Sequence, residues 1–464
     1  MSSSEEKVYF SEVTDRKQAA RLSSAAHSSD DEGVLFQTVK SEIANELLRP
    51  TSARAQANGK SFWRHFLFLR VVLDEILGLQ DAHYERSLPS SSLPDLARIP
   101  LKLERTLGYG VLLCIDTLLY EITLMPLSSF FASVRLLFGR EISVTQRIDL
   151  LRLSLLFFSV LVFNLYVDFS VLYHYLRAQS LLKLYFIFNM LEVVERLVRS
   201  WGSDLMDSLI ASVSLSEGGD VMSLFSHWFL TLVYTCIHAH LHFWRVLLVS
   251  VALVSADSSM FMIVITNNFS ELKSVFKRYE VRSVYPLVTS DIVERLYLMV
   301  DVGLILFSLF TSPQKRRMPL GDILFWIVAM ALLEIVTDWI KFLCISKFNQ
   351  LPSSMFDDFH HLHESEIVSV RSGDSLHSFK GVISFSHSSS RRMHFQGLPL
   401  SALVLVHIFY PTLAGTSSSS VWTYRLLVFA CCFVSKLVLG IGLFGSALRS
   451  DAQVKEKLSN LKAL

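Results

Sequence analysis

Long apolar stretches alternate with short polar and basic connectors from Leu103 to Leu448. This pattern constrains the fold because each long stretch approaches or exceeds the roughly 20 residues that cross a bilayer as a helix. Lipid offers no hydrogen-bonding partner to an exposed backbone, so these stretches are expected to be helical. We therefore predict an all-α fold, a polytopic transmembrane helix bundle. The five longest stretches are Leu107–Met125, Leu153–Tyr173, Ser223–Val254, Leu320–Cys344 and Val421–Leu448.

Two shorter apolar stretches, Leu296–Phe310 and Leu398–Ala414, leave the number of crossings open at about five to eight. Basic residues before the first long stretch place its N-terminal side, and with it the N-terminus, in the cytosol. The connectors 273–282 and 312–318 are also basic, and both flank Leu296–Phe310. They cannot both be cytosolic if that stretch crosses fully. Either the stretch is re-entrant or amphipathic, or one connector is displaced.

The composition agrees with lipid as the main solvent. Apolar residues make up 51% of the chain and charged residues only 18%. The 43 basic and 42 acidic residues nearly cancel, so nucleic acid is not an expected partner. All five cysteines lie within apolar stretches, where a thiol packs as a small hydrophobic group, and no disulfide framework is predicted.

The sequence divides into four parts. Residues 1–60 are polar and Ser-rich, and they are predicted to form a disordered cytosolic tail. Residues 61–105 are predicted to form interfacial amphipathic helices ahead of the membrane, since apolar side chains recur there at three- and four-residue spacing. Residues 106–449 form the helical membrane domain, with a polar loop at 351–396. Residues 450–464 form a short C-terminal tail.

Charged residues within or beside the apolar stretches need an explanation, because a charge at mid-bilayer costs roughly 2.5–3.5 kcal/mol. Asp338 and Lys341 can pair on one face of a helix. Lys436 and Arg152 are expected to snorkel towards the interface. A functional alternative is an ion channel or transporter, although no internal repeat accompanies these residues. The residues of that path would be Asp116, Glu121, Asp168 and Arg177.

Two groups of histidines resemble metal sites in their spacing. His238 and His242 share a helical face, but that face supplies no third ligand. His360, His361 and His363 lie near acidic residues, but without the H-E-x-x-H order of a metalloprotease. Polar histidines at helix interfaces or in loops explain both groups. No metal site is predicted.

Local motifs do not support catalysis. The chain contains neither a P-loop nor a nucleophile elbow. Its G-x-G-x-x-G string, at Gly440, Gly442 and Gly445, lies inside an apolar stretch rather than at a strand-to-helix turn. Small residues there are better suited to letting a neighbouring helix approach closely. We expect a protein that is not an enzyme and holds no cofactor.

Two charged segments are candidate docking surfaces for a partner. Leu181–Arg199 resembles an interfacial helix with a charged face, and residues 271–280 mix both signs along a second such helix. A solvated helix face explains the same pattern, so both interpretations stay open. The candidate docking residues are Glu192, Glu195, Arg196, Glu271, Lys273, Lys277 and Arg278.

Strings of polar and apolar residues, in a fixed order, resemble the transmembrane anterior–posterior transformation (Tapt) family. The resemblance spans roughly Ser61 to Ser450. The strings are RIPLKLE at 98–104, LLCIDTLLY at 112–120, YVDFSVLYHYLRAQS at 166–180, KLYFIFNMLEVVERL at 183–197, TNNFSELKSVFKRYE at 266–280, SDIVERL at 290–296, DWIKFLCISKFN at 338–349 and GLPLSALVL at 397–405.

The resemblance implies a multi-pass membrane protein of the endoplasmic reticulum that is not an enzyme. Relatives in fungi are similar to a partner of a SUN-domain membrane protein, and together the two protect newly made luminal proteins. Vertebrate relatives are linked to secretory trafficking, ciliary basal bodies and axial patterning. We therefore expect a scaffold or adaptor with a SUN-domain partner, acting in luminal protein folding, trafficking or ciliary and developmental roles. The family supplies no catalytic residues to carry over.

Overall fold

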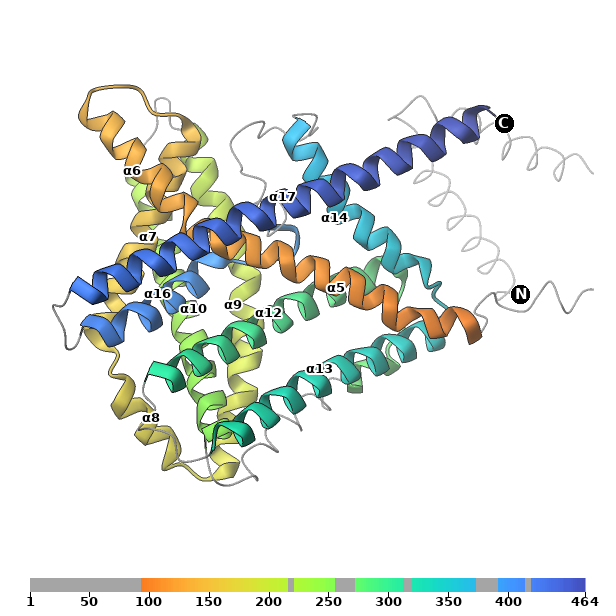
Figure 1. Cartoon of the computed structure of the whole chain (residues 1–464), viewed down its shortest axis with the longest axis horizontal. Helices are drawn as coiled ribbons and strands as arrows, with labels where there is room; N and C mark the ends of the chain where they lie inside the picture. The colour runs from red at the N-terminus through yellow and green to blue at the C-terminus, as the bar shows by residue number, and fades with distance from the viewer. Residues whose placement is uncertain are drawn as a thin grey trace, which may run out of the picture. The chain divides into compact units, whose positions relative to one another are not determined.

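The computed structural model describes residues 93–215, 221–254, 272–311, 319–372, 391–413 and 419–463. The predicted tail at 1–60 and residues 61–92 of the predicted amphipathic segment 61–105 lie outside these ranges, whereas residues 93–105 form the first turns of a long helix, α5 (Leu93–Ile122). Regular structure in the described ranges is helical (Figure 1), which confirms the all-α prediction. The helices are α5 (Leu93–Ile122), α6 (Leu124–Leu137), α7 (Val144–Tyr166), α8 (Phe169–Arg177), α9 (Leu181–Leu215), α10 (Val221–Val254), the 3-10 helix η4 (Leu272–Phe276), α12 (Val281–Thr311), α13 (Leu320–Asn349), α14 (Ser354–Ser372), α16 (Gly397–Leu413) and α17 (Ser419–Ala463).

Five helical segments among the described residues are long and apolar enough to cross a membrane, and they coincide with the five predicted stretches. The polytopic prediction is confirmed. Large apolar side chains remain on their outer faces, as lipid contact requires: Phe157 on α7 and Leu426 on α17 are each more than 60% exposed. The segments are Asp95–Leu137, Val144–Tyr166, Val221–Leu253, Gly321–Asn349 and Arg425–Ala452.

Helix α5 lies at the centre of the described bundle and contacts α6, α12, α13, α14, α16 and α17. Its buried face carries Ile99, Leu103 and Leu107, which recur at four-residue spacing and are almost fully buried. Gly110 allows the closest approach, because a Cβ there would collide with the Ile292 side chain of α12. The small residue therefore brings α12 directly against α5.

A break separates α5 from α6. Pro126 lacks an N–H, and its ring clashes with the carbonyl of the residue four positions earlier, which is Ile122, the last residue of α5. Backbone hydrogen bonds continue on either side, from Thr123 N–H to Leu119 O at 3.0 Å and from Leu127 N–H to Thr123 O at 3.4 Å. Pro126 therefore kinks the chain between α5 and α6.

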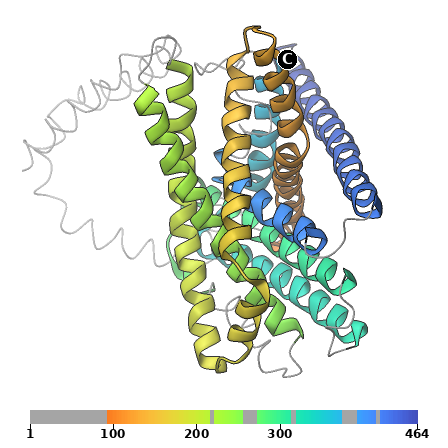
Figure 2. The ribbon, with the colours of Figure 1, turned by 90° about the vertical axis from the view of Figure 1, so that its left-hand side faces the viewer.

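Helices α9 and α10 lie side by side (Figure 2), and α10 also contacts α7, α12 and α16. Their close packing depends on Gly202 of α9, where a Cβ would collide with the hydroxyl of Tyr234 on α10. The predicted interfacial helix Leu181–Arg199 is the first half of α9, which runs on to Leu215.

The two shorter apolar stretches also form helices. Leu296–Phe310 is the C-terminal half of α12, and Leu398–Ala414 corresponds to α16. Neither is among the five spans of the described residues, and the apolar part of α16, Gly397–His407, is shorter than these spans. Helix α12 packs against α5 and α10, and its carboxylates Asp291 and Asp301 are buried inside the bundle.

Two expectations differ from the structure. Residues 271–280 were expected to form a helix like α9, but the described part forms only η4 and then leaves helical geometry. The chain is diverted there because the Tyr279 N–H donates to the Asn349 side chain of α13 at 2.9 Å. The polar segment 351–396 contains α14, rather than loop alone. Met355, Phe359 and Ile367 are buried on one face of α14, which explains why it is helical.

Candidate functional site

A polar pocket of about 320 Å³ opens where α9, η4, α12 and α13 meet. Four of its lining residues are cationic, three are carboxylates, and only one is apolar. A pocket with so many charges is suited to a polar ligand or to a charged segment of a partner. We call it the polar pocket, and its lining residues are Glu192, Arg196, Lys273, Ser274, Lys277, Leu287, Ser290, Asp291, Glu294 and Lys341.

The wall formed by α9 is held by ion pairs. Arg196 Nη2 lies 2.7 Å from Glu192 Oε1, one helical turn away, and 3.3 Å from Glu294 Oε1 of α12. Ser290 also donates a hydrogen bond to Glu294 at 3.0 Å. Glu294 therefore links two helices and fixes the position of the Arg196 guanidinium at the pocket.

A second layer of charges lies beneath this wall. Arg199 contacts Glu195 at 2.7 Å and Glu294 at 3.8 Å, and His238 of α10 lies 3.6 Å from Glu195. Burial alone would raise the pKa of the Glu195 carboxyl, but His238 and Arg199 hold it well below its usual range. At Glu294, too, burial would raise the pKa, but Arg196 and the other nearby cations outweigh this effect and lower the pKa. Both carboxylates are therefore ionised at neutral pH.

The opposite wall is fixed by Lys341 of α13. Its Nζ lies 2.7 Å from Asp291 and 3.4 Å from Asp338, and all three side chains are buried. The predicted pairing of Asp338 with Lys341 is confirmed. Arg295 extends the network, with Nε 2.9 Å from Asp338 and two nitrogens each 2.8 Å from Glu104 of α5.

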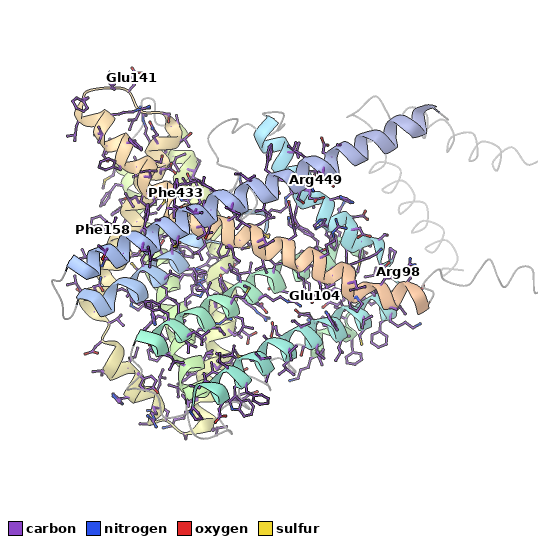
Figure 3. The ribbon with its side chains drawn as sticks, in the orientation of Figure 1. Arg98, Glu104, Glu141, Phe158, Phe433 and Arg449 are labelled. Atoms are coloured by element: carbon purple, nitrogen blue, oxygen red, sulfur yellow. The ribbon has the colours of Figure 1, made fainter. Side chains whose placement is uncertain are left out.

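Glu104 ties this network to the central helix. It accepts the two-pronged hydrogen bond from Arg295 and a further one from the Trp339 indole at 2.8 Å. Figure 3 shows Glu104 on the side of α5 that faces α12 and α13. Bidentate arginine–carboxylate pairs are geometrically specific. The network therefore holds α5, α12 and α13 in register around the polar pocket.

Two cations at the rim differ from the rest. Lys273 and Lys277 have exposed side chains, and within the described residues neither forms an ion pair. Arg196 and Lys341, in contrast, are matched by the three carboxylates of the pocket. The rim therefore carries a surplus of positive charge that favours an acidic ligand.

Comparisons with known proteins fit this architecture. Residues 142–452, more than half of the chain, match the model of a family described as a eukaryotic membrane protein family. The transmembrane anterior posterior transformation protein 1 homolog of Homo sapiens is 31% identical over 387 residues, which cover 78% of this chain and 65% of that protein. The chain belongs to the Tapt family. A homolog from Danio rerio is 32% identical, with 78% of this chain and 64% of the relative covered.

This Tapt-family protein thus spans about two thirds of the length of those two relatives. A more distant relative, the Protein TAPT1 homolog of Drosophila melanogaster, is 29% identical over 401 residues, 82% of this chain and 58% of that protein. No solved structure matches the chain. The range matched by the family model contains every residue that lines the polar pocket.

The structure brings four of the seven candidate docking residues of this Tapt-family protein together. Glu192, Arg196, Lys273 and Lys277 line the polar pocket. Glu195 is 4% exposed and lies in the layer beneath, paired with Arg199. Arg278 is exposed but does not line the pocket, and Glu271 lies outside the described residues.

Three lining residues of the polar pocket were not predicted from the sequence: Asp291, Glu294 and Lys341. They come from α12 and α13, far along the chain from α9. A signal existed in the charges of SDIVERL at 290–296, which interrupt an apolar helix at intervals of three and four residues.

The four residues of the alternative conduction path occupy separate places. Asp116 lies 2.6 Å from Lys436, and Glu121 lies 2.6 Å from Arg152, with both carboxylates almost fully buried. Asp168 is exposed just before α8, where it accepts a hydrogen bond from the Val171 N–H at 3.4 Å. Arg177 is the last residue of α8.

The expectation that Lys436 and Arg152 snorkel to the interface is wrong. Lys436 is 6% exposed and Arg152 is 3% exposed, because each meets a buried carboxylate of α5 instead of reaching water. A buried pair needs no route to the headgroups, since the partner charge compensates for lost hydration. The sequence could not show which helix covers these cations.

The histidines are packing and hydrogen-bonding groups in the described structure. His238 and His242 are stacked with ring centroids 4.5 Å apart, and His242 meets the edge of Tyr297. On α14, His360 and His361 both contact Glu364, at 3.3 and 3.2 Å. Within the described residues, no group of three histidine, cysteine or acidic side chains is arranged to hold a metal ion.

Proposed function

We propose that this Tapt-family protein is a non-enzymatic scaffold of the endoplasmic-reticulum membrane, and that the polar pocket docks an acidic cytosolic segment of a partner membrane protein. The observation that carries the proposal is the pair of exposed rim lysines, Lys273 and Lys277, which give the pocket a net charge of +1, whereas Arg196 and Lys341 are held in ion pairs. Complementary charges steer association and select partners.

The fixed walls support docking because they reduce the cost of binding. Arg196 is held by Glu192 and Glu294, and Lys341 by Asp291 and Asp338. Side chains already ordered before association lose little conformational entropy when a partner arrives. The two exposed lysines can then approach a flexible acidic segment without rearranging the bundle.

The basic residues beside the pocket support a cytosolic position for it. The connector 273–282 is rich in lysine and arginine, which favours the cytosolic side. On the family resemblance, the partner is a SUN-domain membrane protein, and the complex serves luminal protein folding or secretory trafficking. The pocket would bind the cytosolic part of that partner.

The double substitution Lys273→Glu and Lys277→Glu tests the proposal. The full-length chain is expressed at matched levels and purified in mild detergent, and the recovered SUN-domain protein is quantified. Reversal of both rim charges should lower recovery at least tenfold while membrane insertion stays unchanged. The matched control is Lys183→Glu, a charge reversal at an exposed lysine of α9 about 13 Å along the helix from Glu192. Equal recovery with the double variant and the wild type would contradict docking at this pocket.

The alternative function, an ion channel or transporter, receives less support. Asp116 and Glu121 are each matched by a buried cation, whereas Asp168 and Arg177 lie at opposite ends of α8. A conduction path requires such groups to line one wet cavity. Ion flux in liposomes that Asp168→Asn abolishes would favour this alternative over the scaffold.

A further inference from the structure

A second cavity of this protein differs sharply from the polar pocket. It has a volume of about 490 Å³ and lies among the α5–α6 kink, α7, α16 and α17. Its lining is apolar except for Asn164 and Arg425. We call it the apolar groove. It is formed largely by two membrane spans, so its surroundings are hydrocarbon rather than water.

The groove follows one face of each bordering helix. On α7 its lining residues run from Leu153 to Asn164 at three- and four-residue spacing, a length of about 17 Å at 1.5 Å per residue. This length is close to half the roughly 30 Å thickness of the hydrocarbon core, the depth of one leaflet. On α17 a shorter stripe runs from Arg425 to Cys432.

Packing leaves the groove open between these helices. Helix α17 contacts α5 and α14, while α7 packs against α6, α10 and α16. The first turns of α17 therefore face α7 across the groove, with Val404 and Val406 of α16 also lining it. Much of α17 remains exposed on its other faces, as shown by Leu426 and Ile441 at 67% and 73%. Lipid can reach the groove along this helix.

Arg425 gives the groove its one charge. It lies near the beginning of α17, and Asn164 lies near the end of α7. A guanidinium is suited to bidentate binding of phosphate, and an amide can donate a further hydrogen bond. An apolar channel of leaflet depth with one phosphate-binding group matches the chemistry of a phospholipid.

We propose that the apolar groove holds one acyl chain of a bilayer phospholipid and that Arg425 binds the phosphate of the same molecule. The volume falls within the range of small-molecule sites, about 300–1,000 Å³. The bound lipid fills the space between α7 and α17 and completes the packing of the α17 N-terminal half. This site is independent of the polar pocket and of the docking proposal.

Native mass spectrometry of the full-length chain tests this site. The protein is purified in mild detergent, stripped of loosely held lipid, and then incubated with dioleoylphosphatidylcholine. We expect one phospholipid retained per chain. Arg425→Gln should weaken retention roughly tenfold, since it removes the charge-assisted hydrogen bonds to the phosphate. Val160→Trp and Val428→Trp, which fill the groove from opposite walls, should abolish retention.

Matched variants on α17 distinguish this site from the general lipid shell. Leu437→Trp adds the same ring to an exposed position outside the groove, and Arg449→Gln removes an exposed arginine (Figure 3). Both should retain the phospholipid, and elution by size exclusion verifies that each variant is folded. Retention in both groove-filling variants, or equal loss in Leu437→Trp, would overturn the proposal. A bound polypeptide in place of lipid would do so as well.

Discussion

The charged side chains of α5 and those of the polar pocket are balanced by opposite charges to different degrees. Asp116 pairs with Lys436 and Glu121 pairs with Arg152, each at 2.6 Å. The polar pocket instead contains three carboxylates and four cations, a net charge of +1, and the two rim lysines lie outside its ion pairs. Matched pairs hold helices together, whereas surplus charge is available to a partner. The balance of charge within a cluster is therefore a better guide to function than the number of charges near the membrane.

The largest expected effect comes from breaking a matched pair. Arg152→Met leaves the Glu121 carboxylate buried without its cation, although the Ser401 hydroxyl still donates a hydrogen bond to it at 2.9 Å. An uncompensated buried charge should lower the free energy of unfolding by about 3–5 kcal/mol. Thermal unfolding in detergent, followed by loss of the monodisperse peak in size exclusion, measures this effect. Partner recovery per folded molecule should not change.

The double variant Glu121→Gln and Arg152→Met supplies the control for that experiment. Replacing both members removes the charge and its partner together, and such replacements are often neutral. Most of the lost stability should return. If the single variant is as stable as the wild type, the pair does not hold α5 against α7, and the distinction between matched pairs and surplus charge fails for this region.

Acidification should destabilise the protein through a buried histidine of α14, His363, rather than through the carboxylates of the polar pocket. Burial, together with the charges of Arg392 and His360, lowers the pKa of His363 from 6.5 to about 4. Folding favours the neutral form of the His363 ring. Its contribution to the free energy of unfolding is therefore fully present above pH 6.5 and is lost as the pH falls towards 4. The loss amounts to about 3 kcal/mol, at 1.36 kcal/mol for each pH unit. The lowered pKa values of Glu195 and Glu294, in contrast, favour the charged forms of both carboxylates as the pH falls.

Unfolding midpoints between pH 7 and pH 4.5 measure this difference. His363→Phe keeps an aromatic ring beside Tyr285 and should flatten the decline in stability with falling pH. His361→Gln is the control, because that histidine has a half-exposed side chain and should leave the decline unchanged. An equal decline in the wild type and in His363→Phe would show that acid acts elsewhere, including on the ion pairs of the polar pocket.

A smaller effect on stability is expected from removing one charge of the polar pocket while its other ion pairs remain. Glu294→Gln keeps an acceptor for the Ser290 hydroxyl but removes the charge facing Arg196 and Arg199. The loss should be about 1–2 kcal/mol, because both arginines keep a carboxylate partner on α9. Glu192→Gln, at a more exposed pair one turn apart, should cost no more than about 0.5 kcal/mol. Equal costs would mean that Glu294 has no special linking role.

Local patterns in the sequence predicted much of this fold. Apolar length alone located the five spans, since helix formation in lipid depends on composition. Spacing of three residues predicted the contact between Asp338 and Lys341, which lie on one helix. The pairs Asp116–Lys436 and Glu121–Arg152 could not be predicted, because they depend on which helices pack together. Without that information, snorkelling was the natural but wrong expectation for both cations.

The same limit applied to the polar pocket. The charged face of α9 was visible as an interruption of apolar periodicity. The contributions of Asp291 and Lys341 could not be predicted, because these residues belong to α12 and α13 and meet only in the folded bundle, where their ion pair measures 2.7 Å. The rim lysines were selected from a predicted helix that the structure replaces with η4. Their residue types were sufficient to nominate them, although the predicted local structure was wrong.

The smallest effect on stability and the sharpest test of surplus charge come from two neighbouring residues. Lys277 lines the polar pocket, whereas Arg278 is exposed beside it without lining it. Charge reversal at either position should change the free energy of unfolding by no more than about 0.5 kcal/mol, because both side chains are at the surface.

Docking should nevertheless distinguish them. Lys277→Glu places a negative charge beside the pocket carboxylates and should lower recovery of the partner several-fold more than Arg278→Glu does. Recovery of the Lys277→Glu variant should also depend less on salt, since the attraction that salt screens has been removed. If the two reversals act equally, the partner responds to the overall basic character of the connector 273–282. The distinction between a defined pocket and a diffuse basic surface would then have to be given up.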